Sequence, residues 1–493
     1  MSQMSRLLSA SAIAVCAGLG MAGAQTAITV AIQLEPPNLD PTGGAAEAID
    51  SVVYSNIFEG LTRFTADGSV VPGLAASWEI SEDGLVYTFK LHDGVTFHDG
   101  STFDAGDVKF SLDRARAADS TNAQKPLFAQ IADVTVADPM TVQVTLSQPN
   151  GSLLFNLAWG DAVIVAPETA AANATNPVGT GAFTFVNWVQ GDRIELARNP
   201  AYWGTPAVLE TATFRFISDP TAAFAAVMAE DVDVFSGFPA PENLPQFAAD
   251  PRFQVIVGST EGETILAMNN KLPPFDNVLV REAVSHAVDR QAIIDGAMFG
   301  YGTPIGTHFA PHNPAYVDLT AGSAYDPDRA RTLLAEAGFP DGFTTTLKLP
   351  PPSYARRGGE IIAAQLRDVG IETEVSNVEW AQWLEQVFGA KDFGLTIVSH
   401  TEPMDINIYA NPEYYFQYDN PDFQALMTEL TATTDDAART ALMQKAQTII
   451  AENYVNGYLF QLAALTVAKA GVQGLWPDAP VAAIDLTAVS WAK

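Results

Sequence analysis

One stretch, residues 70–114, restricts the fold more than any other part of the sequence. It reads VVPGLAASWEISEDGLVYTFKLHDGVTFHDGSTFDAGDVKFSLDR. Residues 86–91 alternate strictly between two faces, which is typical of a strand. Two His-Asp-Gly turns follow, at 92–94 and 98–100, with a second short strand predicted between them. Asp104 is predicted to cap a helix, because its carboxylate can accept backbone N–H bonds. The strand face comprises Tyr87, Phe89 and Leu91, and the helix stripe comprises Val108, Leu112 and Ala115.

The same stretch also carries an ordered motif. It comprises Pro72-Gly73-Leu74-Ala75 with Ser77-Trp78, Ser81-Glu82-Asp83-Gly84 before Tyr87-Thr88-Phe89, Gly94-Val95 with Phe97-His98-Asp99-Gly100, and Asp107-Val108 with Phe110-Ser111. This order resembles the signature of the family-5 extracellular solute-binding proteins of bacterial ABC importers, a group with dipeptide-, oligopeptide- and nickel-binding members. The resemblance implies an α/β, two-lobed periplasmic binding protein fold (type II, cluster C) with an extra subdomain in the first lobe.

Later segments extend the resemblance along the chain. They are Asn176-Pro177-Val178-Gly179-Thr180-Gly181 and Arg198-Asn199-Pro200-Ala201-Tyr202-Trp203 in the first lobe, and Val280-Arg281-Glu282-Ala283 at the start of the second. The resemblance implies a first lobe over residues 25–267, with the extra subdomain at about 60–175, a second lobe over 268–457, and a return to the first lobe over 458–493. Two crossings near 267 and 458 would form a hinge. Helix and strand patterns alternate through the second lobe, as expected for an α/β domain.

Composition restricts the broad class of protein. The chain has 493 residues and is 48% hydrophobic, which is enough to bury more than one core. Acidic residues outnumber basic residues by 57 to 25, and the formal net charge is −32. A nucleic-acid partner is not expected, because phosphate neutralisation needs clustered Lys and Arg.

The first 24 residues have the pattern of a cleaved secretory signal peptide. Arg6 precedes an apolar run from Leu7 to Leu19, and Ala22-Gly23-Ala24 offers the small-x-small pattern that signal peptidase requires. A membrane anchor is the alternative, but the run is shorter than the roughly 20 apolar residues that span a bilayer. We therefore expect a periplasmic mature protein. Cys16, the only cysteine, would be lost with the signal.

The sequence contains no recognisable catalytic motif. Nucleophile-elbow, zinc-protease and phosphate-loop patterns are missing, and Gly179 and Gly181 fit turns better than a phosphate loop. His308 and His312 have the spacing of a helical metal pair, but Pro311 between them argues against a regular helix. We expect no catalytic residue, no structural metal and no cofactor.

The ligand site is predicted in the segment 380–409. This segment resembles the second-lobe segment of dipeptide-binding members, in which a cleft carboxylate accepts hydrogen bonds from the amino group of the ligand. Glu402 falls at that position, with Asp405 as the second choice and His400 close by. A cationic group removed from water needs such a partner. A solvated glutamate in a loop is the alternative for Glu402.

The chain departs from the dipeptide binders in two places. Those proteins carry an arginine that pairs with the peptide carboxylate, and the resemblance places Leu349, followed by three prolines, at this point. Where they commonly have tryptophan, this chain has Ser399 or His400. Arg356 and Arg357 could supply the missing charge, but both open a predicted helix, where solvation or surface packing is the ordinary role.

Three aromatic residues are further candidate ligand contacts. Trp380 and Trp383 lie three apart on a predicted helix, where such residues either form core or stack on a sugar or a cationic ligand. Tyr54 lies opposite the apolar face of a helix predicted over 49–60, which borders the cleft in the family. A half-buried core position is the alternative for Tyr54.

These features together predict a substrate-binding protein of an ABC importer. It would capture a small polar solute, a peptide or peptide-like molecule, between two lobes and deliver it as a monomer to the inner-membrane permease. Closure can follow binding only if the ligand contacts both lobes. Within the binding class, the alternative ligands are an opine, a sugar derivative or a metal chelate held by His400. A secreted peptide hydrolase is the alternative from another class.

Overall fold

The computed structural model describes residues 25–44, 46–402 and 404–492. The predicted signal peptide, residues 1–24 with Cys16, lies outside these ranges. Within the described ranges, no helix combines the length and the apolar character that crossing a bilayer requires.

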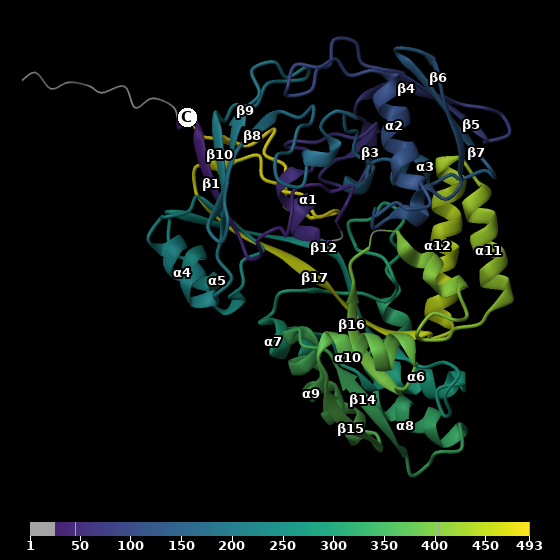
Figure 1. Ribbon diagram of the computed structural model, residues 1–493. Helices are drawn as coiled ribbons and strands as arrows, with labels where there is room; N and C mark the ends of the chain where they lie inside the picture. Colours follow the sequence, from purple (N-terminus) through teal and green to yellow (C-terminus); the bar gives the residue numbers. More distant parts are fainter. Residues whose placement is uncertain (1–24, 45, 403, 493) are drawn as a thin grey trace, which may run out of the picture.

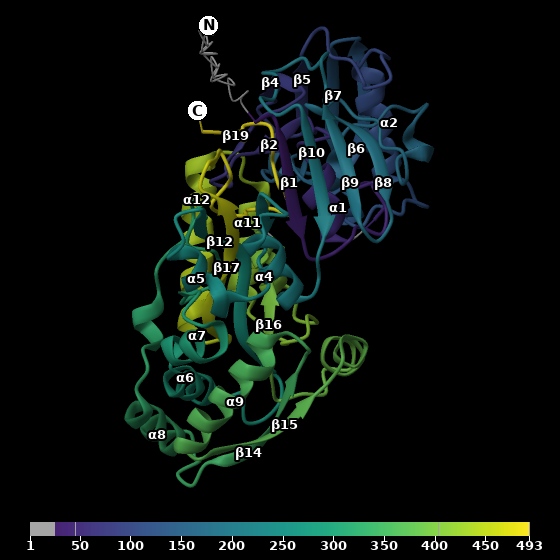
Figure 2. The same cartoon turned by 90° about the vertical axis from the view of Figure 1, so that its left-hand side faces the viewer.

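An eleven-stranded mixed sheet runs through the molecule. The first lobe is formed around the strands at one end of this sheet, and the second lobe around those at the other (Figures 1 and 2). The sheet order is β15 (Ile371–Asn377), β14 (Phe343–Leu349), β16 (Leu395–His400), β12 (Phe253–Met268), β17 (Asn456–Lys469), β11 (Val234–Ser236), β1 (Ala27–Ile32), β10 (Thr211–Phe216), β9 (Arg193–Arg198) and β8 (Phe183–Val189), with β13 (Thr303–Pro304) paired to β17.

Helices cover both parts of the sheet. Outside residues 60–175, the first-lobe helices are α1 (Glu47–Val53), α4 (Pro220–Met228) and α5 (Leu244–Ala248). The second-lobe helices are α6 (Val278–Ala287), α7 (Arg290–Met298), α8 (Pro327–Glu336), α9 (Ser353–Asp368), α10 (Trp380–Trp383), α11 (Pro421–Ala432) and α12 (Asp436–Glu452). Each lobe has its own apolar core, since Val30, Val52 and Phe214 pack in the first and Val284, Leu347 and Ile362 in the second.

Strands β12 and β17 pass between the lobes. They pair antiparallel from Phe253 opposite Lys469 to Ala267 opposite Asn456. β12 is one long strand with a register shift between Ser259 and Glu263. The irregularity lets β12 keep its pairing with β17 while the chain enters the second lobe.

The stretch between residues 70 and 114 belongs to a separate four-stranded sheet in the order β4 (Ala75–Ile80), β5 (Val86–Leu91), β7 (Thr141–Leu146), β6 (Ile131–Asp138). With α2 (Ala105–Arg116) it forms what we call the β4–β7 subdomain. Strand β5 buries Tyr87, Phe89 and Leu91, as predicted. The predicted cap is also present, since the Asp104 side chain accepts a hydrogen bond from Gly106 N at 2.6 Å. The prediction of a strand at 95–97 is wrong. Only an isolated bridge from Thr96 to Thr102 forms, because the chain reverses at Gly100 (φ +89°).

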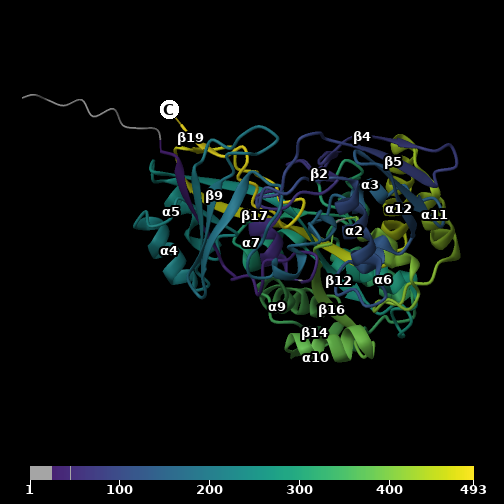
Figure 3. The same ribbon diagram turned by 45° about the horizontal axis from the view of Figure 1, so that its top comes forward.

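Two further elements differ from expectation. The helix predicted over 49–60 ends at Val53, because Tyr54 is extended (φ −66°, ψ 138°) and Ser55 turns the chain with a φ of 61°. Helix α11 was not anticipated. Its last turn accepts a hydrogen bond of 3.0 Å at Thr431 O from Gly151 N, in the segment after β7. Figures 1 and 3 both show α11 and α12 beside the β4–β7 subdomain.

Candidate functional site

Three polar side chains lie in a row across the middle of the main sheet. Glu263 of β12 lies opposite His400 of β16 on one side and Gln461 of β17 on the other. Directly paired residues carry their side chains on the same face of a sheet. All three are almost completely buried, with exposed fractions of 2%, 7% and 1% respectively. The row lies where β12 and β17 pass between the lobes.

Asp405, which follows β16, is held by two histidines. Its Oδ1 lies 2.6 Å from Nε2 of His308, and its Oδ2 lies 3.7 Å from Nδ1 of His400. The Nδ1 atom of His308 lies 3.2 Å from the hydroxyl of Tyr409, so both ring nitrogens are engaged. Burial alone would raise the pKa of Asp405, but the charges and hydrogen bonds of His308 and His400 hold this pKa well below its usual range. Asp405 is therefore an ionised carboxylate with a fixed orientation.

A second histidine–carboxylate pair lies nearby on the irregular part of β12. His312 Nε2 lies 2.5 Å from Glu261 Oε1, and His312 Nδ1 lies 2.7 Å from Ser259 Oγ. His308 and His312 lie outside the helices, as Pro311 led us to expect. Three of the six histidines of the sequence, His308, His312 and His400, nevertheless contact carboxylates at the lobe junction.

Several buried polar atoms at this junction have no hydrogen-bond partner among the described residues. They are Glu261 Oε2, Glu263 Oε2, Ser399 Oγ and both side-chain polar atoms of Gln461. Burial, together with the charges of Glu261 and Asp405, raises the pKa of Glu263 well above its ordinary value. Buried polar groups are nearly always paired with protein or water, so these atoms are available to the polar groups of a bound solute.

Glu402 lies in the loop after β16 and is exposed. Its Oε2 accepts a hydrogen bond from Thr401 N at 3.2 Å. Partial burial and the charge of Glu402 raise the pKa of Glu47, the first residue of α1. A charge effect of this kind requires the two carboxylates to lie near each other.

Asp50 and Asp161 form an acidic pair on the first lobe. A Cβ atom on Gly160 would lie 2.1 Å from Asp50 Oδ1, so the glycine makes room for this carboxylate. Burial raises the pKa of Asp161 to about 7. Burial and the charge of Asp161 raise the pKa of Asp50 well above its ordinary value. The Oδ1 atom of each has no hydrogen-bond partner in the described structure.

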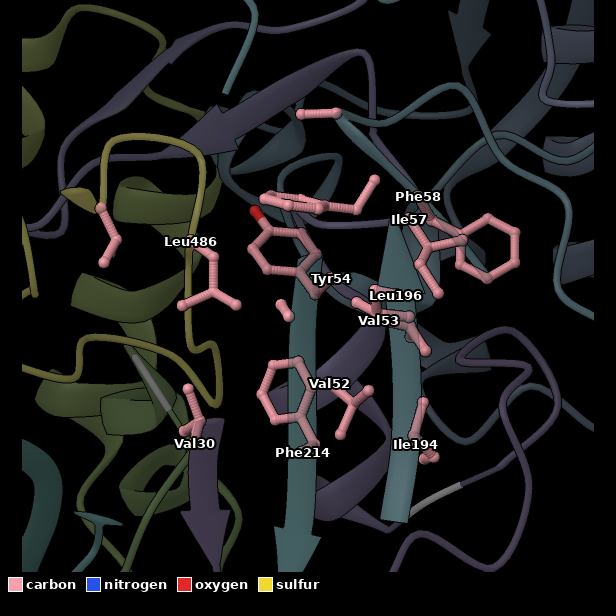
Figure 4. Packing of buried hydrophobic residues seen from close by; sticks show 14 of the residues in the cluster. Val30, Val52, Val53, Tyr54, Ile57, Phe58, Ile194, Leu196, Phe214 and Leu486 are labelled. Carbon is pink, nitrogen blue, oxygen red and sulfur yellow. The ribbon is translucent and has the colours of Figure 1, made fainter. Parts of the chain in front are cut away.

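The aromatic candidates occupy different environments. Tyr54 is 2% exposed, and its hydroxyl donates to Ala158 O at 2.5 Å; Figure 4 shows it among the apolar side chains of the first-lobe core. Trp383 is 5% exposed, and its Nε1 donates to Thr396 Oγ1 at 3.0 Å. These contacts favour the core alternative for both residues. Trp380 is 41% exposed and stays a candidate contact.

Sequence reasoning missed the buried members of the site. Glu263 and Gln461 come from the two long strands, and Asp50 and Asp161 from the first lobe. The sequence did carry one signal, since Glu261 and Glu263 come shortly before the apolar residues 265–268 of the same buried strand segment. Burying a charged side chain in a strand costs free energy, and a ligand site is one function that accounts for such a residue.

One group of side chains could hold a divalent cation. Donor atoms of His400, Glu402 and Asp405 all lie within 4.8 Å of one another. His400 Nε2 lies 3.1 Å from the Tyr415 hydroxyl, and His400 Nδ1 and Asp405 Oδ2, which lie 3.7 Å apart, are the two atoms that an ion would bind. Imidazole and carboxylate groups are suitable ligands for zinc, nickel or copper, so the donor chemistry fits such an ion.

Comparison with known proteins identifies the family. Residues 69–405 match the model of the bacterial extracellular solute-binding proteins, family 5 (middle region). The chain belongs to this family. The "Glutathione-binding protein GsiB" of Salmonella paratyphi A is 33% identical over 370 residues, covering 73% of this chain and 71% of that protein. The protein of the same name from Pectobacterium atrosepticum is 32% identical over 434 residues, covering 83% and 84%.

Solved structures of family-5 members share the fold. HbpA2 from Haemophilus parasuis has a TM-score of 0.85 and 26% identity, covering 95% of this chain and 100% of that chain. The periplasmic binding protein DppA from Helicobacter pylori, in complex with the peptide STSA, has a TM-score of 0.78 and 25% identity, covering 95% and 99%. The predicted fold, two-lobed and α/β, is confirmed, and the chain is a substrate-binding protein of the kind that serves bacterial ABC importers.

Proposed function

We propose that this family-5 protein captures a peptide or peptide-like solute with a protonated amino group and delivers it to an ABC permease in the inner membrane. The proposal rests mainly on one observation. An exposed carboxylate, Glu402, lies beside the ionised and fixed carboxylate of Asp405 at the lobe junction. An ammonium group that leaves water needs such partners, because an unpaired buried charge costs several kcal/mol. The relatives, whose names refer to glutathione and to peptide complexes, support the same class of solute.

The lobe boundaries inferred from the sequence belong to this proposal. The first lobe covers residues 25–267 and 458–493, with the extra subdomain at about 60–175, and the second lobe covers 268–457. Both β12 and β17 pass between the lobes close to these boundaries, which supports a hinge there. A solute that contacts both lobes would favour the closed state. The protein would act as a periplasmic monomer and would bind and release its solute without a catalytic step.

The arginines that could pair with a ligand carboxylate are engaged elsewhere. Arg356 Nη2 lies 3.0 Å from Glu379 Oε1, and the Arg357 guanidinium lies 5.3 Å from the ring centroid of Phe299. Leu349, at the position where dipeptide binders carry arginine, is buried in the second-lobe core. A free peptide carboxylate is therefore not a requirement of this site, so an opine or an amino-sugar derivative stays within the proposed class.

A metal chelate is a second candidate, favoured by the donor atoms of His400, Glu402 and Asp405. A chelate would use these side chains as ligands, whereas an amine would use only the two carboxylates. Elemental analysis of the purified protein after exposure to Ni²⁺ or Zn²⁺ distinguishes the two. A stoichiometric metal that is lost in His400→Ala would favour the chelate.

A thermal-shift screen of ligand-free protein tests the main proposal. Small peptides with a free amino terminus should raise the unfolding midpoint, and the N-acetylated forms of the same peptides should not. Equal shifts with free and acetylated peptides would contradict the amino-group anchor. Mass spectrometry of the peptides after incubation tests the alternative of a peptide hydrolase, which would leave cleavage products.

A further inference from the structure

One loop of the second lobe extends to the point where β12 passes between the lobes. The loop covers residues 305–318, between β13 and α8. Its side chains Ile305 and Phe309 belong to the same buried apolar cluster as Val398 of β16, so the loop is anchored in the second lobe. His312 lies in a turn of this loop and is the residue that contacts β12.

His312 is held on both sides by residues of β12. Its Nδ1 atom lies 2.7 Å from Ser259 Oγ, and its Nε2 atom lies 2.5 Å from Glu261 Oε1. Ser259 in turn binds the C-terminal segment, since its backbone N–H and its hydroxyl donate to Asp478 Oδ1 at 2.7 and 2.8 Å. A chain of hydrogen bonds therefore runs from the second-lobe loop through β12 to Asp478. We call Glu261, His312, Ser259 and Asp478 the hinge bridge.

The far end of the hinge bridge belongs to the first lobe. Val472 and Leu486, on either side of Asp478 in the sequence, are part of the first-lobe core. A Cβ atom on Gly68, in the first lobe, would lie 4.0 Å from His312 Cδ2 and 3.4 Å from Pro480 Cβ. His312 is thus a second-lobe side chain that lies against the first lobe.

The hinge bridge meets β12 where this strand is irregular. Pairing of β12 with β17 is interrupted between Ser259 and Glu263, and a strand bends at such an interruption. The C-terminal segment holds the same point a second time, because Ala479 N donates to Ser259 O at 2.8 Å. The hinge bridge therefore lies at the hinge proposed above, where the two lobes are joined.

The hydrogen bonds of the hinge bridge determine the charge of His312. A carboxylate only accepts hydrogen bonds, so the one hydroxyl proton of Ser259 is used toward Asp478. The Nδ1 atom of His312 therefore carries a proton and donates it to Ser259 Oγ. The Nε2 atom donates a second proton to Glu261, whose carboxylate has no other partner in the described part of the chain. His312 is thus an imidazolium, and 7% of its side chain is exposed.

The titratable groups around His312 favour this positive charge. They are carboxylates on each element that lies against it, namely Glu261 and Glu263 of β12, Asp478 of the C-terminal segment, and Asp67 of the turn that contains Gly68. Within the described ranges, none of these four is paired with a lysine or an arginine. Without the imidazolium, Glu261 would be a buried carboxylate with no counter-charge, which is strongly unfavourable.

We propose that His312 is a positioning residue for the lobes, which as an imidazolium holds the loop 305–318 on Ser259 and thereby on Asp478 of the first lobe. Rotation of one lobe relative to the other would move this loop away from Asp478, so the hinge bridge restricts that rotation. Loss of the charge of His312 should release it. The lobes should therefore be more restricted at pH 6, where the bridge is complete, than at pH 9, where the imidazolium loses a proton. This inference rests on the proposed hinge and not on the identity of the solute.

The distance between two spin labels, one on each lobe, tests this proposal on the mature chain. Residues 25–493 contain no cysteine, so labels attach only at introduced positions. Val186→Cys on the first lobe and Asp328→Cys on the second are suitable, because both positions are exposed. Pulsed electron spin resonance at pH 6 should give a narrow distance distribution for the otherwise unchanged chain. The distribution should be broader or shifted in His312→Gln, which has a polar but uncharged side chain.

A matched control and a second variant accompany His312→Gln. His286→Gln removes another second-lobe histidine, whose Nδ1 atom lies 2.7 Å from Ala324 O within the same lobe, and should keep the narrow distribution. Ser259→Ala keeps the pair of His312 and Glu261 but breaks the connection to Asp478, and should broaden the distribution. Urea unfolding checks that each variant is folded, and Ser259→Ala carries the test if His312→Gln is not.

The pH profile distinguishes the charge of His312 from a purely structural role. Raising the pH from 6 to 9 should broaden the distribution of the unsubstituted chain toward that of His312→Gln. The same change of pH should leave His312→Gln unaltered, because the titrating group is gone. A broadening with pH that persists in this variant would show that another group is responsible and would refute the proposal.

The remaining outcomes are equally decisive. A narrow distribution at pH 6 in both His312→Gln and Ser259→Ala would overturn the proposal. Broadening in Ser259→Ala alone would assign the connection to Ser259 and Asp478 and refute the role of His312. Broadening in His286→Gln as large as in His312→Gln would mean that a general loss of stability, and not the hinge bridge, moves the lobes. None of these results bears on solute capture, which the thermal-shift screen measures without reference to the lobe distance.

Discussion

His308 Nε2 lies 2.6 Å from Asp405 Oδ1, although the two residues are 97 positions apart in the sequence. This contact fixes one oxygen of Asp405 and leaves the other beside His400 and Glu402, where a cation can reach it. The pair joins the loop after β13 to the segment after β16, so it contributes to both the fold and the site.

Asp405→Asn is expected to lower the free energy of unfolding by about 1 to 3 kcal/mol at pH 7, because it removes a charged hydrogen bond. The pKa of Asp405 is lowered in the folded protein, so its stabilisation is present above the unfolded pKa of about 4 and is lost as the pH falls below it. Urea unfolding at pH 7 and pH 3 measures the difference, which should shrink at pH 3. An equal loss at both pH values would contradict this account of the pair.

Asp161→Asn is expected to stabilise the protein at alkaline pH. Burial raises the pKa of Asp161 to about 7, so ionisation of this group is disfavoured in the folded state. The resulting penalty is absent below the unfolded pKa near 4, grows between pH 4 and 7, and is complete above pH 7. The variant should gain about 2 to 4 kcal/mol at pH 8 and little at pH 4, measured by urea unfolding. Loss of stability at pH 8 would show that the carboxylate has a partner in solution.

The two tryptophans should respond differently to substitution. Trp383→Phe removes a buried indole and its hydrogen bond to Thr396, and should cost about 1 to 3 kcal/mol of unfolding free energy. Trp380→Phe, at a half-exposed position, should change stability by less than about 0.5 kcal/mol. Chemical denaturation of both variants measures this contrast. Similar losses for the two would mean that Trp380 is also part of the core.

Gly151→Ala should disturb the contact between the α11–α12 connection and the β4–β7 subdomain. A Cβ atom there would lie 1.8 Å from Thr433 O, so the backbone on one side has to move. The expected cost is about 1 to 3 kcal/mol, with a larger radius of gyration in small-angle scattering. Gly322→Ala is the control, because nothing lies within 4 Å of its added Cβ. An unchanged radius of gyration and unchanged stability would rule out a tight contact in solution.

The fold was largely predictable because its signals are local. The alternation of residues 86–91 and the cap at Asp104 each depend on a few neighbouring residues, and the structure has both. The strand at 95–97 was misjudged, since the formation of a strand rather than an isolated bridge depends on the partner segment.

The site was only partly predictable. Glu402, Asp405 and His400 do lie together, because they are close in the sequence and follow one strand. Glu263 and Gln461 reach the same place only through the register of β12 and β17, and Asp161 reaches its place through the packing of α1. No spacing in a single sequence indicates such contacts between distant segments.

The most direct test of the central claim is native mass spectrometry of the protein purified without denaturation from periplasmic extract. The account predicts one small cationic, amine-containing molecule per chain, retained in Glu413→Gln, an exposed-carboxylate control from the same lobe, and lost or much reduced in Glu402→Gln. The same bound molecule at equal occupancy in Glu402→Gln, or a bound molecule with no amino group, would contradict the role of Glu402 as the anchor of the solute.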